Sequence, residues 1–355
     1  MRTANHVHAC FWSSIFPLVS LDKCKFGLYM PVSQTPVRFS ARWIFLLDYV
    51  FILRPTHFFP LWATFFSGYV TASQSALFSI SPFPFLAWLA ATLAAGHVYL
   101  FNQLADVESD KINNKLFILA DGRVALPIIW IEGGVLVFLS LGLSWLVSLE
   151  FFLAIIFAST LGLSYTFLGI MNRPIPSLVA NSLGGSAAFI AGAYAVDTSI
   201  LAAHSISFWH LIFWSLPHTF AYAAVSALVT LPDMPGDAQC GKQTIALAYG
   251  VQSTLQIALF SDVLALLFSL LTMNWHCIFT IGLTALISLP LFWHTARRGA
   301  CAKIFVPVKY SMLVLTVSVS LFFPPLLLLA ALNFLACRAY YRTRFGVDYP
   351  NLQPA

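Results

Sequence analysis

The chain has 355 residues, of which 59% are hydrophobic and only 9% are charged, and its mean hydropathy is +0.84. Because soluble domains carry about 25% charged residues, this composition excludes an ordinary soluble protein and predicts a polytopic membrane protein. The net charge of +5 is scattered among the expected loops, which argues against a nucleic-acid partner, and the six cysteines form no CxxC pair or Cys/His cluster typical of a zinc site.

The chain divides into a leader, a membrane domain and a tail. Residues 1–43 are mixed in character and predict a poorly ordered cytoplasmic leader; residues 44–340 form the transmembrane domain, and 341–355 the C-terminal tail. The apolar runs are continuous, which predicts helices rather than the alternating strands of a membrane barrel. The expected spans are 44–72, 83–105, 124–147, 149–168, 177–197, 208–231, 246–272, 276–295 and 304–337. The last exceeds one helix of about 20 residues and is interrupted by Pro324-Pro325, so it is one broken span or two short ones.

Two acidic motifs follow apolar runs. In the first, Asn102, Asp106 and Asp110 are spaced four residues apart, so on a helix they share one face within an arc of roughly 80°. The second repeats this spacing with Asp233 and Asp237. Carboxylates one turn apart repel each other, and a hard divalent cation is the obvious means of offsetting that repulsion.

The basic residues predict which side of the membrane the motifs occupy. Lys and Arg precede the first span and follow the second, fourth, sixth and eighth, whereas the alternate loops near 73–82, 148, 198–207 and 273–275 carry none. This asymmetry places the N-terminus and both motifs in the cytoplasm. The last cluster, Arg338, Arg342 and Arg344, is cytoplasmic only with ten spans, so charge alone favours ten.

Two facing acid pairs at one membrane surface suit a particular ligand. Magnesium prefers oxygen ligands and is usually held by one or two carboxylates together with waters and substrate phosphates. We therefore expect the four aspartates to bind Mg²⁺, with a diphosphate completing the coordination and Asn102 contributing its amide. Nearby cations suit phosphate oxygens, and the candidates are Lys111, Lys242, Arg173 and Lys115. Lys115, like Glu108 and Asp121, is equally well explained as a solvated loop charge.

The two motifs resemble the aspartate-rich motifs of the UbiA superfamily of intramembrane prenyltransferases, the second being followed by Gly241-Lys242. The resemblance covers about residues 44–350. Matches that are weak alone are Leu53-Arg54-Pro55, Tyr165 with Asn172-Arg173-Pro174, and the ending Arg338-Ala339-Tyr340-Tyr341 with Arg344-Phe345-Gly346 and Tyr349-Pro350. The sequence departs from the family at Gln103, where Asp is commoner, and around Lys115-Leu116 and Asp121-Gly122, where other pairs are usual.

The resemblance implies an all-α membrane fold of about nine transmembrane helices around a central cavity that opens laterally to lipid. It also implies Mg²⁺-dependent transfer of a polyprenyl group from its diphosphate to a small, lipid-soluble and often aromatic acceptor. Carried over by motif, the catalytic and metal-binding residues would be Asp106, Asp110, Asp233 and Asp237. The substrate-binding residues would be Asn102, Tyr165, Arg173 and Lys242.

Two other functions are compatible with parts of the sequence. A terpene cyclase of the same fold would use the same motifs but quench the allylic cation internally, without an acceptor. A secondary transporter would place ionisable groups near the membrane midplane, whereas here only Arg54, Asp262 and Lys309 lie deep in apolar runs. The four aspartates lie at span ends beside loop cations, which favours the enzyme.

Overall fold

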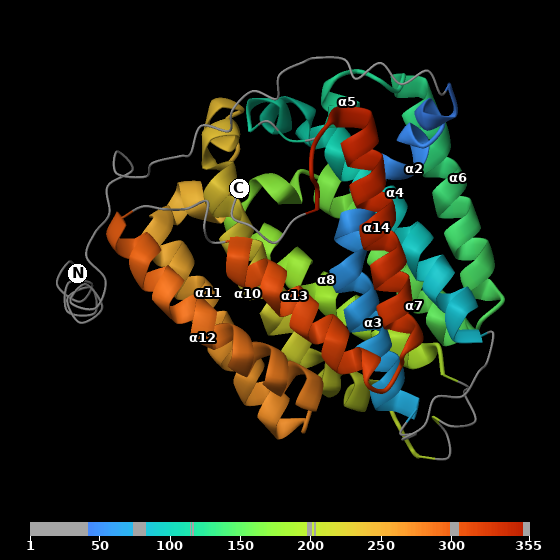
Figure 1. Cartoon of the computed structure of the whole chain (residues 1–355). Coiled ribbons are helices and arrows are strands. Elements are labelled where there is room, and N and C mark those ends of the chain that lie inside the picture. The colour runs from blue at the N-terminus through green and yellow to red at the C-terminus, as the bar shows by residue number, and fades with distance from the viewer. Residues whose placement is uncertain are drawn as a thin grey trace.

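The computed structural model describes residues 42–73, 83–113, 115, 117–196, 201, 204–298 and 305–350. Within these ranges every regular element is a helix, and the long helices run side by side in one bundle (Figure 1). The predicted leader lies outside the described residues except for its last two positions, and so do residues 351–355 of the tail. The all-α fold expected from the continuous apolar runs is confirmed.

The first expected span, 44–72, is broken into four elements. These are η2 (Arg42–Phe45), α2 (Asp48–Phe51), η3 (Pro55–His57) and α3 (Phe58–Ser73). The break falls at Arg54, whose backbone is left-handed with φ 54° and ψ 63°. Proline disfavours the right-handed helical region for the residue before it, so Pro55 ends the run at Arg54 and starts the next turn.

Among the described residues, six helices are long and apolar enough to cross a membrane. They are α4 (Phe83–Ile112), α6 (Leu126–Trp145), α7 (Leu149–Phe167), α8 (Pro174–Tyr194), α10 (Phe208–Gln239) and α11 (Ile245–Leu271). Short elements α5 (Phe117–Ala120) and η4 (Ile170–Asn172) lie in the connections. Ser148 caps α7 by accepting a hydrogen bond from the Phe151 N–H at 3.1 Å.

Helices α4 and α10 continue beyond the predicted ends at 105 and 231. No proline or glycine interrupts residues 106–112, so α4 carries the first acidic motif in its last turns. In α10, Pro232 and Pro235 lie inside the helix, although each lacks the N–H that would bond to the carbonyl four residues earlier. Both motifs are therefore held on helices rather than on flexible loops.

Small residues let α3 and α8 pack closely, as they do between helices in lipid. A Cβ atom at Gly192 of α8 would overlap the backbone carbonyl of Phe65 in α3. In the reverse direction, a Cβ atom at Gly68 of α3 would overlap the carbonyl of Phe189 in α8. The two backbones are in direct contact, and neither position tolerates a larger residue without a shift of a helix.

The C-terminal run forms separate helices. After α12 (Trp275–Arg298), the chain forms α13 (Phe305–Ser320) and α14 (Pro325–Phe345), with the break at 321–324 where the double proline begins. The end of α14 lies at the same end of the bundle as α2 and α5 (Figure 1), and Phe51, Ile118 and Tyr341 share one hydrophobic cluster. The basic end of the chain thus lies on the acidic-motif side, the arrangement that the charge pattern favours.

Candidate active site

The two acidic motifs face each other because α4 and α10 meet at their C-terminal ends. The side chain of Asn113 joins the helices: its Nδ2 donates to the Asp233 carbonyl at 3.2 Å, and its Oδ1 accepts from the Gly236 N–H at 2.9 Å. A Cβ atom at Gly236 would overlap the Ser109 carbonyl. Glycine at this position is thus what permits the close approach of the two helices.

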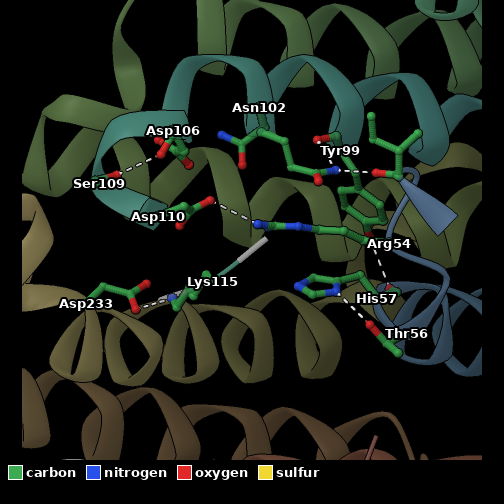
Figure 2. A network of polar contacts seen from close by, with 12 residues as sticks. Arg54, Thr56, His57, Tyr99, Asn102, Asp106, Ser109, Asp110, Lys115 and Asp233 are labelled. Carbon is green, nitrogen blue, oxygen red and sulfur yellow. Dashed lines mark hydrogen bonds and ion pairs between the residues drawn. The ribbon is translucent and has the colours of Figure 1, made fainter. Parts of the chain in front are cut away.

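In the first motif, each aspartate is paired with a cation from a distant part of the chain. Figure 2 shows one of these pairs, Arg54 with Asp110. The Arg54 Nη2 lies 3.0 Å from Asp110 Oδ2, and both side chains are largely buried. The Lys242 Nζ lies 2.5 Å from Asp106 Oδ1. Asn102 lies one turn earlier on the same helix, with its Nδ2 4.0 Å from the Met171 sulfur.

In the second motif, Asp233 forms an ion pair with Lys115. Asp237 lies 3.6 Å from the Lys242 Nζ. Lys242 therefore bridges the two motifs, and its ammonium also donates to the Ser109 hydroxyl at 2.7 Å. Burial alone would lower the pKa of Lys242, but Asp106 and Asp237 outweigh this and raise it above the ordinary value.

The cluster contains four carboxylates and three cations, Arg54, Lys115 and Lys242, so with every carboxylate ionised it carries one excess negative charge. Among the residues that the structure describes, no three acidic, histidine or cysteine side chains converge as a ready-made metal site. Lys242 contacts both Asp106 and Asp237, so a cation lies between carboxylates of the two motifs. The donor set is nevertheless one that a hard divalent ion prefers, because it consists of carboxylate oxygens with an amide nearby.

The other predicted substrate-binding residues lie around the cluster. The Tyr165 hydroxyl is within hydrogen-bond distance of the Ser177 Oγ at 3.1 Å and accepts from Asn181 Nδ2 at 3.4 Å, so α8 fixes its position. Arg173 is exposed at the N-cap of α8, and Lys111 is exposed in the last turn of α4. In the described part of the chain, neither of these two cations has a side-chain partner.

Gln103, where the sequence departs from the family pattern, serves the fold instead of the acidic face. It is 2% exposed, and its Nε2 donates to the Ile52 carbonyl at 2.7 Å and to the Tyr99 carbonyl at 3.1 Å. It thereby ties α4 to the turn that precedes Arg54. A carboxylate at this position could not donate either hydrogen bond.

Sequence reasoning gave too little weight to three residues. The sequence points to Arg54 only through an Arg-Pro match and its depth in an apolar run. Lys115 is equally well explained as a loop charge, and no motif includes Asn113. The sequence feature that indicates a functional role for Arg54 is a single cation, followed by proline, inside an apolar run. For Asn113 it was its position four residues after Ser109, directly after the helix that carries the motif.

Comparisons with known proteins agree with this architecture. The model of the "UbiA prenyltransferase family" matches residues 60–313. The chain is 24% identical over 219 residues to naringenin 8-dimethylallyltransferase 2, chloroplastic, of Sophora flavescens, a match that covers 59% of this chain. The chain spans about half the length, 51%, of that curated relative.

Solved structures share the fold. A UbiA homologue from Archaeoglobus fulgidus, described as bound to DMAPP and Mg²⁺, has a TM-score of 0.58 and 16% identity, covering 78% of this chain and 99% of its own. An apo UbiA homologue from Aeropyrum pernix K1 has a TM-score of 0.55 and 17% identity, covering 72% and 94%. Together with the six apolar helices, these likenesses identify an integral, multi-pass membrane protein. The chain belongs to the UbiA prenyltransferase family.

Proposed function

We propose that this protein transfers a prenyl group from a prenyl diphosphate to a small, lipid-soluble acceptor in a Mg²⁺-dependent reaction within the membrane. The observation that carries the proposal is the cluster of four aspartates and three cations where α4 and α10 meet. Carboxylates suit the metal and cations suit the phosphate oxygens, so the cluster contains both halves of a site for a metal–diphosphate.

Asp106, Asp110, Asp233 and Asp237 would hold the Mg²⁺, with Asn102 one turn away on the face of Asp106. When bound, the ion would neutralise the charge that develops on the departing diphosphate. Two A. fulgidus UbiA homologue structures, described as bound to DMAPP and Mg²⁺ and to GPP and Mg²⁺, support this composition of ligands. They share only 16% and 18% identity with the chain, so the residue assignments rest on the geometry of this site.

The three paired cations have a second role in the proposal. Arg54, Lys115 and Lys242 neutralise the carboxylates when no ligand is bound, and they can turn to phosphate oxygens when the carboxylates bind the metal. The guanidinium of Arg54 suits bidentate contact, and the lysines act as mobile point charges. Lys111 and Arg173 are exposed and unpaired in the described structure, so they are available to contact a diphosphate at the rim.

The reaction balances without a further reagent. The bond between the prenyl C1 and the diphosphate oxygen breaks, and the electron pair leaves with the diphosphate. The resulting allylic cation forms a new bond to an electron-rich carbon of the acceptor, which then loses a proton. Aromatic faces can stabilise such a cation, and Tyr99, which stacks on Phe58 with ring centroids 5.9 Å apart, is a candidate together with Tyr165 and Tyr222.

We propose an aromatic acceptor. The name of the S. flavescens relative, a dimethylallyltransferase acting on naringenin, supports this choice. We also propose an orientation of the protein in the membrane. The distribution of Lys and Arg favours a cytoplasmic N-terminus and cytoplasmic active-site loops. Labelling of single cysteines introduced near Lys111 in sealed vesicles would test the orientation.

The central experiment uses membranes that contain the full chain. Radiolabelled dimethylallyl, geranyl and longer prenyl diphosphates are incubated with a panel of aromatic acceptors, with and without EDTA. We expect a prenylated acceptor that requires a divalent ion. A cyclic hydrocarbon or alcohol formed without acceptor would replace the transferase by a cyclase, and consumption of no prenyl diphosphate in any combination would overturn the proposal.

A further inference from the structure

The backbone of Arg54 adopts a conformation that its surroundings must enforce. Its φ of 54° is in the left-handed region, which residues with a side chain adopt only rarely. Such conformations persist where neighbouring structure over-determines them, often at functional sites. At Arg54 the turn aims the guanidinium at Asp110, at 3.0 Å, so the strain lies at the residue that joins the N-terminal elements to the first acidic motif.

The C-terminal helix α14 contacts the chain just before Arg54. Asp48 of α2 is 3% exposed and accepts hydrogen bonds from the Tyr340 hydroxyl at 2.6 Å and from Arg344 Nε and Nη2 at 3.1 and 3.0 Å. The ring of Phe51 stacks on that of Tyr340, with centroids 3.8 Å apart and planes within 4°. A buried carboxylate is tolerated only when it is paired in this way, so α2 and α14 are held together.

Helix α14 and Tyr349 of the tail also form hydrogen bonds with the chain just after Arg54. The Asn333 Nδ2 of α14 donates to the Pro55 carbonyl at 2.8 Å. The Tyr349 hydroxyl lies 3.2 Å from the Thr56 Oγ1. Arg54 is therefore flanked within six residues on one side and two on the other by contacts from a segment nearly 300 positions later in the sequence.

We propose that α14 and Tyr349 are positioning elements for Arg54, which set the guanidinium for contact with the diphosphate. This inference rests on the proposed function, because it gives Arg54 a phosphate to bind. The hydrogen bonds that the described structure gives these side chains go to Pro55, Asp48 and Thr56, and none of them goes to the four aspartates. These side chains act through the turn at Arg54, so removing one of them should weaken diphosphate binding only while Arg54 is present.

A double-mutant cycle tests this dependence. Mg²⁺-dependent binding of dimethylallyl diphosphate to the purified full chain is measured calorimetrically for Arg344→Gln, Arg54→Gln and the double variant. We expect each single change to weaken binding about tenfold, the loss typical of one charge-assisted hydrogen bond, and the double variant to bind no more weakly than Arg54→Gln alone. An affinity about a hundredfold lower in the double variant, which is the product of the two single losses, would overturn the proposal. Normal binding in Arg344→Gln would overturn it as well.

Two controls separate positioning from folding and from the proposed function. Arg342→Gln removes an exposed cation from the same turn of α14 and should leave binding unchanged. If Arg344→Gln fails to fold, Tyr349→Phe removes a single hydroxyl and should give a smaller loss that disappears in the Arg54→Gln background; a loss that persists there counts against the proposal. If Asp233→Ala abolishes binding while Arg344→Gln and Tyr349→Phe do not weaken it, only the positioning role fails; normal binding in Asp233→Ala would refute the proposed function.

Discussion

Lys242 is the residue whose removal should disturb the cluster most, because it is shared by both motifs. Its ammonium lies 2.5 Å from Asp106 Oδ1, 2.7 Å from Ser109 Oγ and 3.6 Å from Asp237 Oδ1, and its side chain is 13% exposed. Replacing it with methionine keeps the stem but removes the charge. Two aspartates, 20% and 9% exposed, then lose their common counter-ion.

The magnitude follows from those contacts. A hydrogen bond to a charged group contributes about 1.5–3 kcal/mol to stability, and breaking a fully buried ion pair costs about 3–5 kcal/mol. Because Asp106 keeps a fifth of its surface in contact with solvent, and the Asp237 contact is long, the lower range applies. We expect Lys242→Met to lower the free energy of unfolding of the ligand-free protein by about 2 kcal/mol at neutral pH.

The pH dependence of this loss has a definite sign. The folded-state pKa of Lys242 is raised, so its stabilising effect is fully present below the unfolded lysine pKa of about 10.4 and is lost as pH rises through the higher folded value. The wild type and Lys242→Met should therefore differ most at neutral pH. Their stabilities should converge in strongly alkaline solution.

Unfolding of the purified proteins in detergent, followed by circular dichroism over a pH series, measures both effects. Lys242→Arg keeps the charge and should retain most of the stability, and Arg342→Gln provides a control for loss of an exposed cation. Equal stability of Lys242→Met and wild type at pH 7 would refute the assigned bridge. So would a stability difference that persists unchanged through the alkaline range.

Three further predictions concern the acids, the metal and the helix contact. Asp106→Ala or Asp233→Ala should abolish product formation while the protein is still expressed in membranes, because each removes an expected metal ligand; full activity in either variant would remove the assignment. EDTA should stop the reaction and added Mg²⁺ should restore it, measured as radiolabelled product; activity that survives chelation would exclude the metal role. Gly236→Ala should destabilise the protein by about 1–3 kcal/mol in the same unfolding assay, because its Cβ would overlap the Ser109 carbonyl, whereas Gly134→Ala, with nothing within 4 Å of the new atom, should not.

The sequence was sufficient to predict the fold class and to predict that the two acidic motifs lie on the same side of the membrane. Continuous apolar runs leave helices as the only way to satisfy backbone hydrogen bonds in lipid. The four-residue spacing then fixes the relative directions of Asp106 and Asp110 on α4. That both motifs lie on the same side followed from the alternation of basic loops, and the structure brings them together at the joint made by Asn113.

The partners of the aspartates could not be predicted in this way. Which cation faces which carboxylate depends on how close α4, α10 and the N-terminal turn approach, and that distance is set by features without periodicity. One is the fit of Gly236 against Ser109. Another is the break at Pro55, which a hydropathy profile averages into a single span although the backbone reverses its handedness at Arg54.

The excess negative charge of the cluster has a consequence for the order in which ligands bind. Lys111 and Arg173 can attract a free diphosphate to the rim, but inside the cluster it meets four carboxylates and three cations that are already paired. Each of these three cations would have to leave a carboxylate to contact a phosphate oxygen. A divalent ion held by Asp106, Asp110, Asp233 and Asp237 would offset the excess charge, so that Arg54, Lys115 and Lys242 would be free to contact phosphate oxygens. The metal should therefore be required for the prenyl diphosphate to bind, as well as for the C–O bond to break. Calorimetry with dimethylallyl diphosphate in EDTA separates the two requirements, since binding of undiminished affinity without Mg²⁺ would contradict the charge balance derived from these ion pairs.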